Sequence, residues 1–144
     1  MKLEDLIYMT RVYARDNNSY MFTDTTISMF INQAIDRLKQ YKVFNGMKKL
    51  VHSSDVVTHV PEEYQYILAL FAASRCFDID ERFYEGTEKR NEFEYYLSEL
   101  ISDVQAGNIT ISDGEGNAVE DTENAIEYVV DTYFESSTSN EDEL

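Results

Sequence analysis

The chain has 144 residues, which fits one domain with a single hydrophobic core. Its formal net charge is −16, and such a surface repels phosphate backbones and acidic membranes, which disfavours ordinary sequence-specific DNA binding. One cysteine excludes a disulfide framework within the chain and fits a reducing compartment, and no run approaches the roughly 20 apolar residues that span a bilayer.

The negative charge belongs to the C-terminal part of the chain. Residues 1–90 carry 12 basic and 13 acidic side chains, whereas residues 91–144 carry 15 acidic side chains and no basic one. We therefore expect two parts with different roles: a nearly neutral folded part, and an acidic part that meets other molecules.

The first 41 residues are predicted to form two helices. Apolar side chains recur at helical spacing over residues 2–16, with Arg11 and Arg15 on the opposite face, and a polar cluster then ends the helix. Thr23 and Asp24 are both good N-caps for a second helix that frays near residue 41. The connection is short, which predicts an antiparallel pair.

Residues 42–60 predict an extended excursion between the second and third helices. Asn45-Gly46 favours a hairpin turn, and the residues that follow have β-forming side chains. The stretch is too long for a tight helix–helix turn. Two interpretations remain open: a contact arm between subunits, and a surface loop with a small hairpin.

Residues 61–77 predict a central helix that the other helices surround. Pro61 suits a first helical turn, and Glu62 and Glu63 complement the positive end of the helix dipole. Apolar side chains occupy nearly all sides of the helix that follows, which is typical of a buried helix.

A long fourth helix is predicted over residues 80–105. Gly86 lowers its helix propensity by about 1 kcal/mol relative to alanine, so a kink or break is possible near residues 85–87. The sequence Ala-Gly-Asn at 106–108 is a C-cap signal. The expected fold is all-α: a bundle of about four helices over residues 1–107, with the extended loop at 42–60.

The remaining residues predict an acidic arm (108–135) and a tail (136–144) whose composition is typical of disorder. The apolar residues of the arm fit an amphipathic helix over residues 122–134, and a lone stripe of this kind is marginal in water without a partner surface. We therefore expect the arm to order against a neighbouring subunit or another protein. Its interface candidates are Ile126, Val129, Val130, Tyr133 and Phe134.

The sequence predicts no catalytic residue, metal site or cofactor. It has no glycine-rich phosphate loop, nucleophile elbow or Cys/His metal cluster. His52 and His59 are seven residues apart, which does not place them on one face of a strand. Cys76 lies in the apolar helix and is expected to be a buried structural thiol. The chain is therefore expected not to be an enzyme.

Arg75 is a further interface candidate. It lies at an apolar position of the central helix, where an arginine needs a partner. We expect either a buried ion pair, with Asp78 or Asp80, or an ion pair between subunits. For Asp80 a solvated cap with an ion pair to Arg82 is the simpler expectation.

Four motifs resemble the head–tail connector, or adaptor, proteins of tailed bacteriophages. They are Phe-Ile-Asn-Gln-Ala-Ile at 30–35, Pro-Glu-Glu-Tyr at 61–64, Ala-Ala-Ser-Arg at 72–75 and Phe-Glu-Tyr-Tyr-Leu at 93–97. The resemblance covers about residues 1–104 and rests on the order of the helices and these motifs.

The resemblance implies a structural virion component, assembled in the host cytoplasm and located in the neck of the particle. Adaptors form a homo-oligomeric ring, expected to be a dodecamer, beneath the portal protein. The ring extends the DNA channel, binds the next tail or neck component, and lets genomic DNA pass without specific binding. On this chain the portal contact would fall to residues 108–134, and ring or channel building to residues 42–59.

Two other functions fit parts of the sequence. The acidic segment is also typical of a protein that mimics DNA and inhibits a nucleic-acid-binding protein. A hydrolase that uses the carboxylates of Asp78 and Asp80 is the third possibility, although no substrate pocket is evident in the sequence.

Overall fold

The structure, a computed structural model, describes residues 1–16 and 21–119. This part of the chain is a small all-α bundle, as the sequence predicts. Its α-helices are α1 (Leu3–Ala14), α2 (Asp24–Leu38), α3 (Ile67–Ile79) and α4 (Phe83–Gln105), and short 3-10 helices lie at η1 (Lys42–Phe44) and η2 (Glu62–Tyr64). None of the described helices combines the length and hydropathy required to cross a lipid bilayer.

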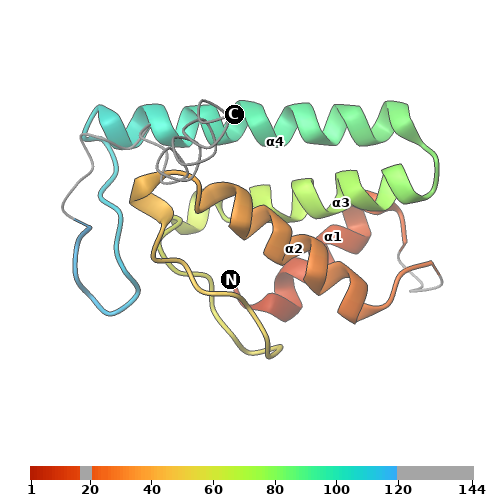
Figure 1. Ribbon diagram of the computed structural model, residues 1–144, viewed down its shortest axis with the longest axis horizontal. Helices are drawn as coiled ribbons and strands as arrows, with labels where there is room; N and C mark the ends of the chain where they lie inside the picture. The colour runs from red at the N-terminus through yellow and green to blue at the C-terminus, as the bar shows by residue number, and fades with distance from the viewer. Residues whose placement is uncertain (17–20, 120–144) are drawn as a thin grey trace, which may run out of the picture.

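Helix α3 is the centre of the bundle and contacts each of the other three α-helices. Figure 1 shows α4 along one long edge, α3 beneath it, and α1 and α2 on the other side of α3. Leu68, Ala69 and Ala72 are fully buried, as expected of a helix that is apolar on nearly all sides. Burying this helix supplies much of the hydrophobic stabilisation of the fold.

Helix α3 begins later than the sequence predicts. Pro61 precedes the 3-10 turn η2, and the α-helix starts at Ile67. Gln65 fixes this entry, because its side chain donates to the Val60 carbonyl at 2.9 Å and accepts from the Met1 amino group at 2.5 Å. The proline therefore begins a separate turn that leads into the buried helix.

Helix α4 begins at Phe83, whereas the sequence predicts a start at residue 80. Glu81, just before it, has a φ of 60°, which interrupts the helical path between α3 and α4. The helix then continues through Gly86 without a break. At its end Gly107 takes a φ of 77°, and Asn108 N–H donates to the Asp103 carbonyl at 3.0 Å, so the predicted C-cap is present.

Residues 42–60 form an extended loop whose apolar side chains belong to the core. The Asn45-Gly46 pair does not form a hairpin: η1 occupies this place, and Met47 N–H donates to the Phe44 carbonyl at 3.1 Å. The bulky side chains of the loop explain the difference, because burying them draws the chain inward. They are Val43, Phe44, Met47, Leu50, Val57 and Val60.

The core continues past residue 107. Ile111 is fully buried within the same hydrophobic cluster as the helices, and Val119 N–H donates to its carbonyl at 2.8 Å. The first part of the predicted arm therefore folds onto its own bundle. The rest of the predicted arm and the tail at 136–144 lie outside the described residues.

Candidate functional site

Arg75 does not form a buried ion pair with Asp78 or Asp80, which is the first of the two alternatives expected from the sequence. Its side chain is exposed, Asp78 pairs instead with Arg90 of α4, and Asp80 pairs with Arg82 at 4.0 Å. Arg75 therefore lies on the solvent side of α3. An ion pair with another subunit stays a prediction.

The other predicted interface residues are Ile126, Val129, Val130, Tyr133 and Phe134, and all five lie outside the described residues.

The buried arginine of the bundle is Arg11, which the sequence pattern places on an outer face. Its guanidinium donates to Asp16 at 2.9 Å, to the Phe22 carbonyl at 2.9 Å and to Asp24 at 2.6 Å. Asp16 in turn accepts from the Phe22 N–H at 3.2 Å. This network fastens the end of α1 to the start of α2. The sequence signal for this ion-pair network was the presence of two acids, Asp16 and Asp24, after Arg11.

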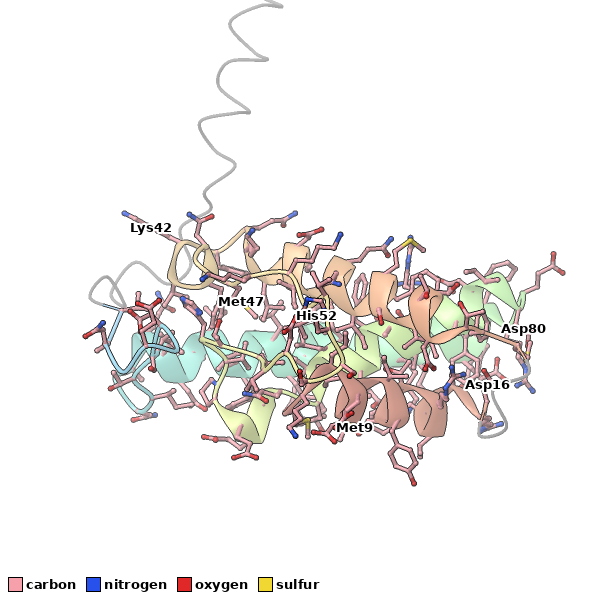
Figure 2. All side chains as sticks on the ribbon, turned by 90° about the horizontal axis from the view of Figure 1, so that it is seen from below. Met9, Asp16, Lys42, Met47, His52 and Asp80 are labelled. Carbon is pink, nitrogen blue, oxygen red and sulfur yellow. The ribbon has the colours of Figure 1, made fainter. Side chains whose placement is uncertain are left out.

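The first candidate interaction surface is an open cleft between α2 and the extended residues 49–51, which we call the α2 groove. It has a volume of about 390 Å³. Its lining residues are Thr25, Ser28, Met29, Asn32, Gln33, Asp36, Lys49, Leu50 and Val51. Met29 and Val51 are 51% and 66% exposed, so its apolar floor faces solvent. Figure 2 shows this side of the molecule, with the loop passing from Met47 to His52 beside α2.

Asn32 fixes the shape of the α2 groove. Its side-chain amide donates to the Leu50 carbonyl at 2.8 Å, and its side-chain oxygen accepts from the Leu50 N–H at 2.8 Å. The loop therefore lies along α2 as an extended strand would lie beside a partner strand. This contact joins residues 18 positions apart and has no local signal in the sequence.

The α2 groove is lined by one acid, Asp36, and one base, Lys49, and the chain that follows Asp36 is basic. Residues 37–54 carry five lysines and arginines and no acid. Lys48 and Lys49 are exposed beside the apolar floor. In a chain of net charge −16, this run is the strongest local concentration of positive charge. The groove therefore suits an apolar partner that carries negative charge.

The second candidate surface lies at the turn between α3 and α4, and we call it the aromatic end. Ile79, Phe83 and Tyr84 are 59%, 62% and 82% exposed there. Residues 78–88 carry five acids and one arginine, so these apolar side chains lie in acidic surroundings. The aromatic end thus has the opposite character to the α2 groove.

A third candidate surface is a cleft of about 440 Å³ between residues 57–63 and 108–114. His59 lines it with a φ of 69°, its Nδ1 lies 2.8 Å from the Thr58 hydroxyl, and its ring lies against Gly46. Burial lowers the pKa of His59, and the nearby Asp113 carboxylate opposes this effect in part. A neutral imidazole is therefore held as part of the fold.

The single cysteine, Cys76, is buried in α3. Burial raises the pKa of Cys76 to about 12, which makes its thiol a poor nucleophile at neutral pH. In residues 1–16 and 21–119 no group of three or more His, Cys, Asp and Glu side chains could hold a metal ion. The exposed apolar surfaces are therefore the most informative features of this part of the chain.

Comparisons of the chain with protein-family models, with curated proteins and with solved structures gave no match.

Proposed function

We propose that this chain is a structural component of a tailed bacteriophage: a head–tail connector that forms a ring beneath the portal protein, extends the DNA channel and binds the next tail or neck component. The observation that carries the proposal is the presence of two different exposed apolar surfaces on one small bundle, one beside Lys48 and Lys49 and the other among acids. The helix order and the motifs that resemble adaptor proteins support the same role.

A ring needs two different surfaces on each subunit, because each copy must bind its neighbours head to tail. The α2 groove and the aromatic end meet this requirement. We propose that Phe83 and Tyr84 of one copy enter the groove of the next, beside Met29 and Val51, while the acids around them face Lys48 and Lys49. The attraction between these acids and lysines then determines which surface of one copy meets which surface of the next.

The size of these surfaces explains why the ring would need the portal. Each buried large apolar side chain contributes about 1.5–3 kcal/mol, whereas association costs about 4–15 kcal/mol in lost translational and rotational freedom. A few such side chains therefore give a weak contact between two free copies. A portal ring that holds several copies side by side removes most of that cost, so the connector assembles at its place of use.

The charge of the described helices agrees with a DNA conduit. Helix α4 carries Glu88 and Glu99 as exposed acids, whereas its Glu94 pairs with Arg37 at 3.1 Å. An acidic wall does not hold phosphates, so a duplex would slide past it. In this role the DNA is cargo that passes without specific binding.

Mixing two variants tests the head-to-tail contact. The double variant Phe83→Asp, Tyr84→Asp removes the aromatic end, and Lys48→Glu, Lys49→Glu reverses the charge of the groove. All four residues are exposed, so both proteins should fold.

At high concentration or on the portal, neither variant alone should assemble into rings. An equimolar mixture should form heterodimers and no ring, as measured by native mass spectrometry. Rings formed by either variant alone would disprove this interface.

The phage role itself is tested with the portal protein encoded in the same genome. Electron microscopy of the two purified proteins together should show rings of this chain on one end of the portal. As a matched control, Tyr95→Asp changes an exposed tyrosine of α4 outside both surfaces and should leave the rings intact. A chain that stays monomeric and never binds the portal argues against the connector role.

The acidic segment also favours a second candidate function, mimicry of DNA. Residues 91–144 place 15 acids without a base on one part of the chain. A mimic should bind basic DNA-binding proteins and release them as salt rises. Competition for a fluorescent duplex measures this, and a protein that never displaces DNA removes this candidate.

A further inference from the structure

Four tyrosines and two acids form a partly exposed surface where η2 and the start of α3 lie against α4, and we call it the tyrosine face. Its residues are Tyr64, Tyr66, Tyr95, Tyr96, Glu99 and Asp103. The Tyr66 and Tyr96 rings meet edge to face with their centroids 5.5 Å apart, and the Tyr95 and Tyr96 rings do so at 5.2 Å. The Tyr64 hydroxyl donates to the Asp103 carboxylate at 2.6 Å. The rings therefore hold one another in place along α4.

Glu99 lies among these rings. A hydrogen bond to Glu99, together with the charge of its carboxylate, raises the pKa of Tyr95. Burial first, and the charge of Glu99 in part, raise the pKa of Tyr66. The pKa of Tyr64 is raised to about 12, first by its hydrogen bond to Asp103 and in smaller part by the charge of Glu99. One exposed carboxylate is thus within electrostatic reach of three tyrosines.

The tyrosine face lacks a cation to balance Glu99. Residues 91–105 carry four acids and no base. Two of these acids have partners from outside this stretch, since Glu92 pairs with Lys89 at 3.3 Å and Glu94 pairs with Arg37 at 3.1 Å. In residues 1–16 and 21–119 no lysine or arginine pairs with Glu99. The charge of the face is therefore negative, with Lys89 already engaged at its edge.

Arg37 shows how this molecule holds a cation between a carboxylate and a tyrosine on α4. Its Nε and one terminal nitrogen donate to the two oxygens of Glu94 at 3.3 and 3.1 Å, and its guanidinium lies 5.4 Å from the centroid of the Tyr41 ring. A planar guanidinium suits both contacts, because it pairs with a carboxylate through two nitrogens and stacks on an aromatic ring. The tyrosine face presents the same two features, a carboxylate and adjacent rings.

The charge of the chain favours a different protein over a second copy as the source of this cation. Each copy has a net charge of −16, so a further contact between copies at an acidic face is disfavoured. Four of the six arginines, moreover, already pair with acids of their own chain. A basic partner meets neither obstacle.

We propose that the tyrosine face binds an arginine side chain of a partner protein, with the guanidinium paired with the Glu99 carboxylate and stacked on an adjacent tyrosine ring. The binding itself rests on the contacts and charges of the described residues. The identity of the partner rests on the proposed function: the ring uses the α2 groove and the aromatic end, which leaves this face for the next tail or neck component. Glu99 then faces that partner and not the DNA.

Nuclear magnetic resonance of the full-length chain, titrated with tetra-arginine amide, tests this inference. The backbone amide resonances of residues 62–66 and 95–103 should shift. Tetralysine amide at the same concentration should shift them less, because an ammonium group neither stacks flat on a ring nor forks to a carboxylate. Both peptides also meet the acids of residues 120–144 through charge alone. Shifts confined to those residues, or equal shifts with the two peptides, overturn the proposal.

Two variants and two matched controls separate the tyrosine face from general attraction by charge. Tyr95→Leu and Glu99→Gln should each weaken the tetra-arginine affinity, measured from the resonances of the face, by about two- to fivefold. Tyr84→Leu and Glu88→Gln make the same changes elsewhere on α4 and should leave that affinity unchanged. All four side chains are exposed, so the variants should fold.

Equal losses of affinity in the variants and their controls overturn the proposal, because net charge alone would then attract the peptide. Shifts of the same resonances when the protein is concentrated without peptide also overturn it, since a second copy would then cover the face. The titration uses no portal protein, so failure of the connector role and failure of the tyrosine face give different results.

Discussion

Gly86 of α4 lies directly against the side-chain carboxylate of Asp78 in α3. A Cβ atom at residue 86 would overlap Oδ1 of Asp78 and lie 3.2 Å from the Ser74 carbonyl oxygen. The same carboxylate pairs with Arg90, one turn further along α4. Helices α3 and α4 therefore approach each other closely where the sequence has a glycine.

Gly86→Ala is expected to destabilise the protein, although alanine is the better helix former by about 1 kcal/mol. Overpacking of a tight contact costs about 1–3 kcal/mol, which exceeds the gain in propensity. Urea unfolding followed by circular dichroism measures the change. Ser98→Ala, at an exposed position of α4, is the control and should not destabilise. A more stable Gly86→Ala variant would show that α3 and α4 move apart without cost.

Replacing Asp16 by alanine should cost about 3–5 kcal/mol of unfolding free energy, because it leaves the buried guanidinium of Arg11 without its inner partner. Asp24 touches the same guanidinium, but its side chain is 76% exposed. Asp24→Ala should therefore cost less than about 1 kcal/mol. Urea unfolding measures both costs. Equal losses of unfolding free energy for the two substitutions would show that burial does not determine how much each ion pair contributes to stability.

His59 should make the folded protein sensitive to mild acid. Burial lowers its pKa below the ordinary value of 6.5, so the unfolded chain takes up this proton at a higher pH than the folded protein. Its contribution to stability is therefore complete above pH 6.5 and is lost as the pH falls toward the folded-state pKa. The pKa values of Asp55 and Asp113 are lowered from 3.8, so their contributions are lost only at lower pH.

The variant His59→Asn checks this pH dependence. Asparagine tolerates the left-handed backbone of this position and does not titrate. The unfolding free energy of the variant should change less between pH 7 and about pH 5 than that of the parent chain, because one proton-binding group is removed. A variant whose slope equals that of the parent chain would assign the acid sensitivity elsewhere.

Truncation should locate the end of the core. A chain that stops after residue 107 loses Ile111, whose burial contributes about 1.5–3 kcal/mol. It should therefore be less stable, by about that amount, than a chain that stops after residue 119. Thermal or urea unfolding of both chains measures the difference. Equal midpoints would show that residues 108–119 only rest on the surface.

The elements with local signals could be read from the sequence. Thr23 accepts from the Thr26 N–H at 3.1 Å, as a predicted N-cap should, and Gly107 ends α4 as predicted. The buried position of α3 also followed from its composition. These features depend on residues a few positions apart, so a short stretch of sequence is enough to predict them.

The positions of the two arginines could not be read in the same way. Helix α3 is apolar on nearly all sides, so its pattern gives no direction for Arg75, which is exposed. Arg11 is buried because the connection to α2 folds Asp16 and Phe22 over it. Burial of this kind depends on how two helices meet. The α2 groove was missed for the same reason, because it needs Asn32 and Leu50 in contact.

The bidentate contact of Asn32 with Leu50 has a further consequence. One amide group presents a donor and an acceptor in a single plane, and only asparagine offers both at this reach from α2. Deamidation would exchange the NH₂ group for an oxygen and set it against the Leu50 carbonyl. Ageing of the purified protein would thus weaken the hold of the helix on the loop and, with it, the burial of Leu50, and an increase of about one mass unit would report the deamidation.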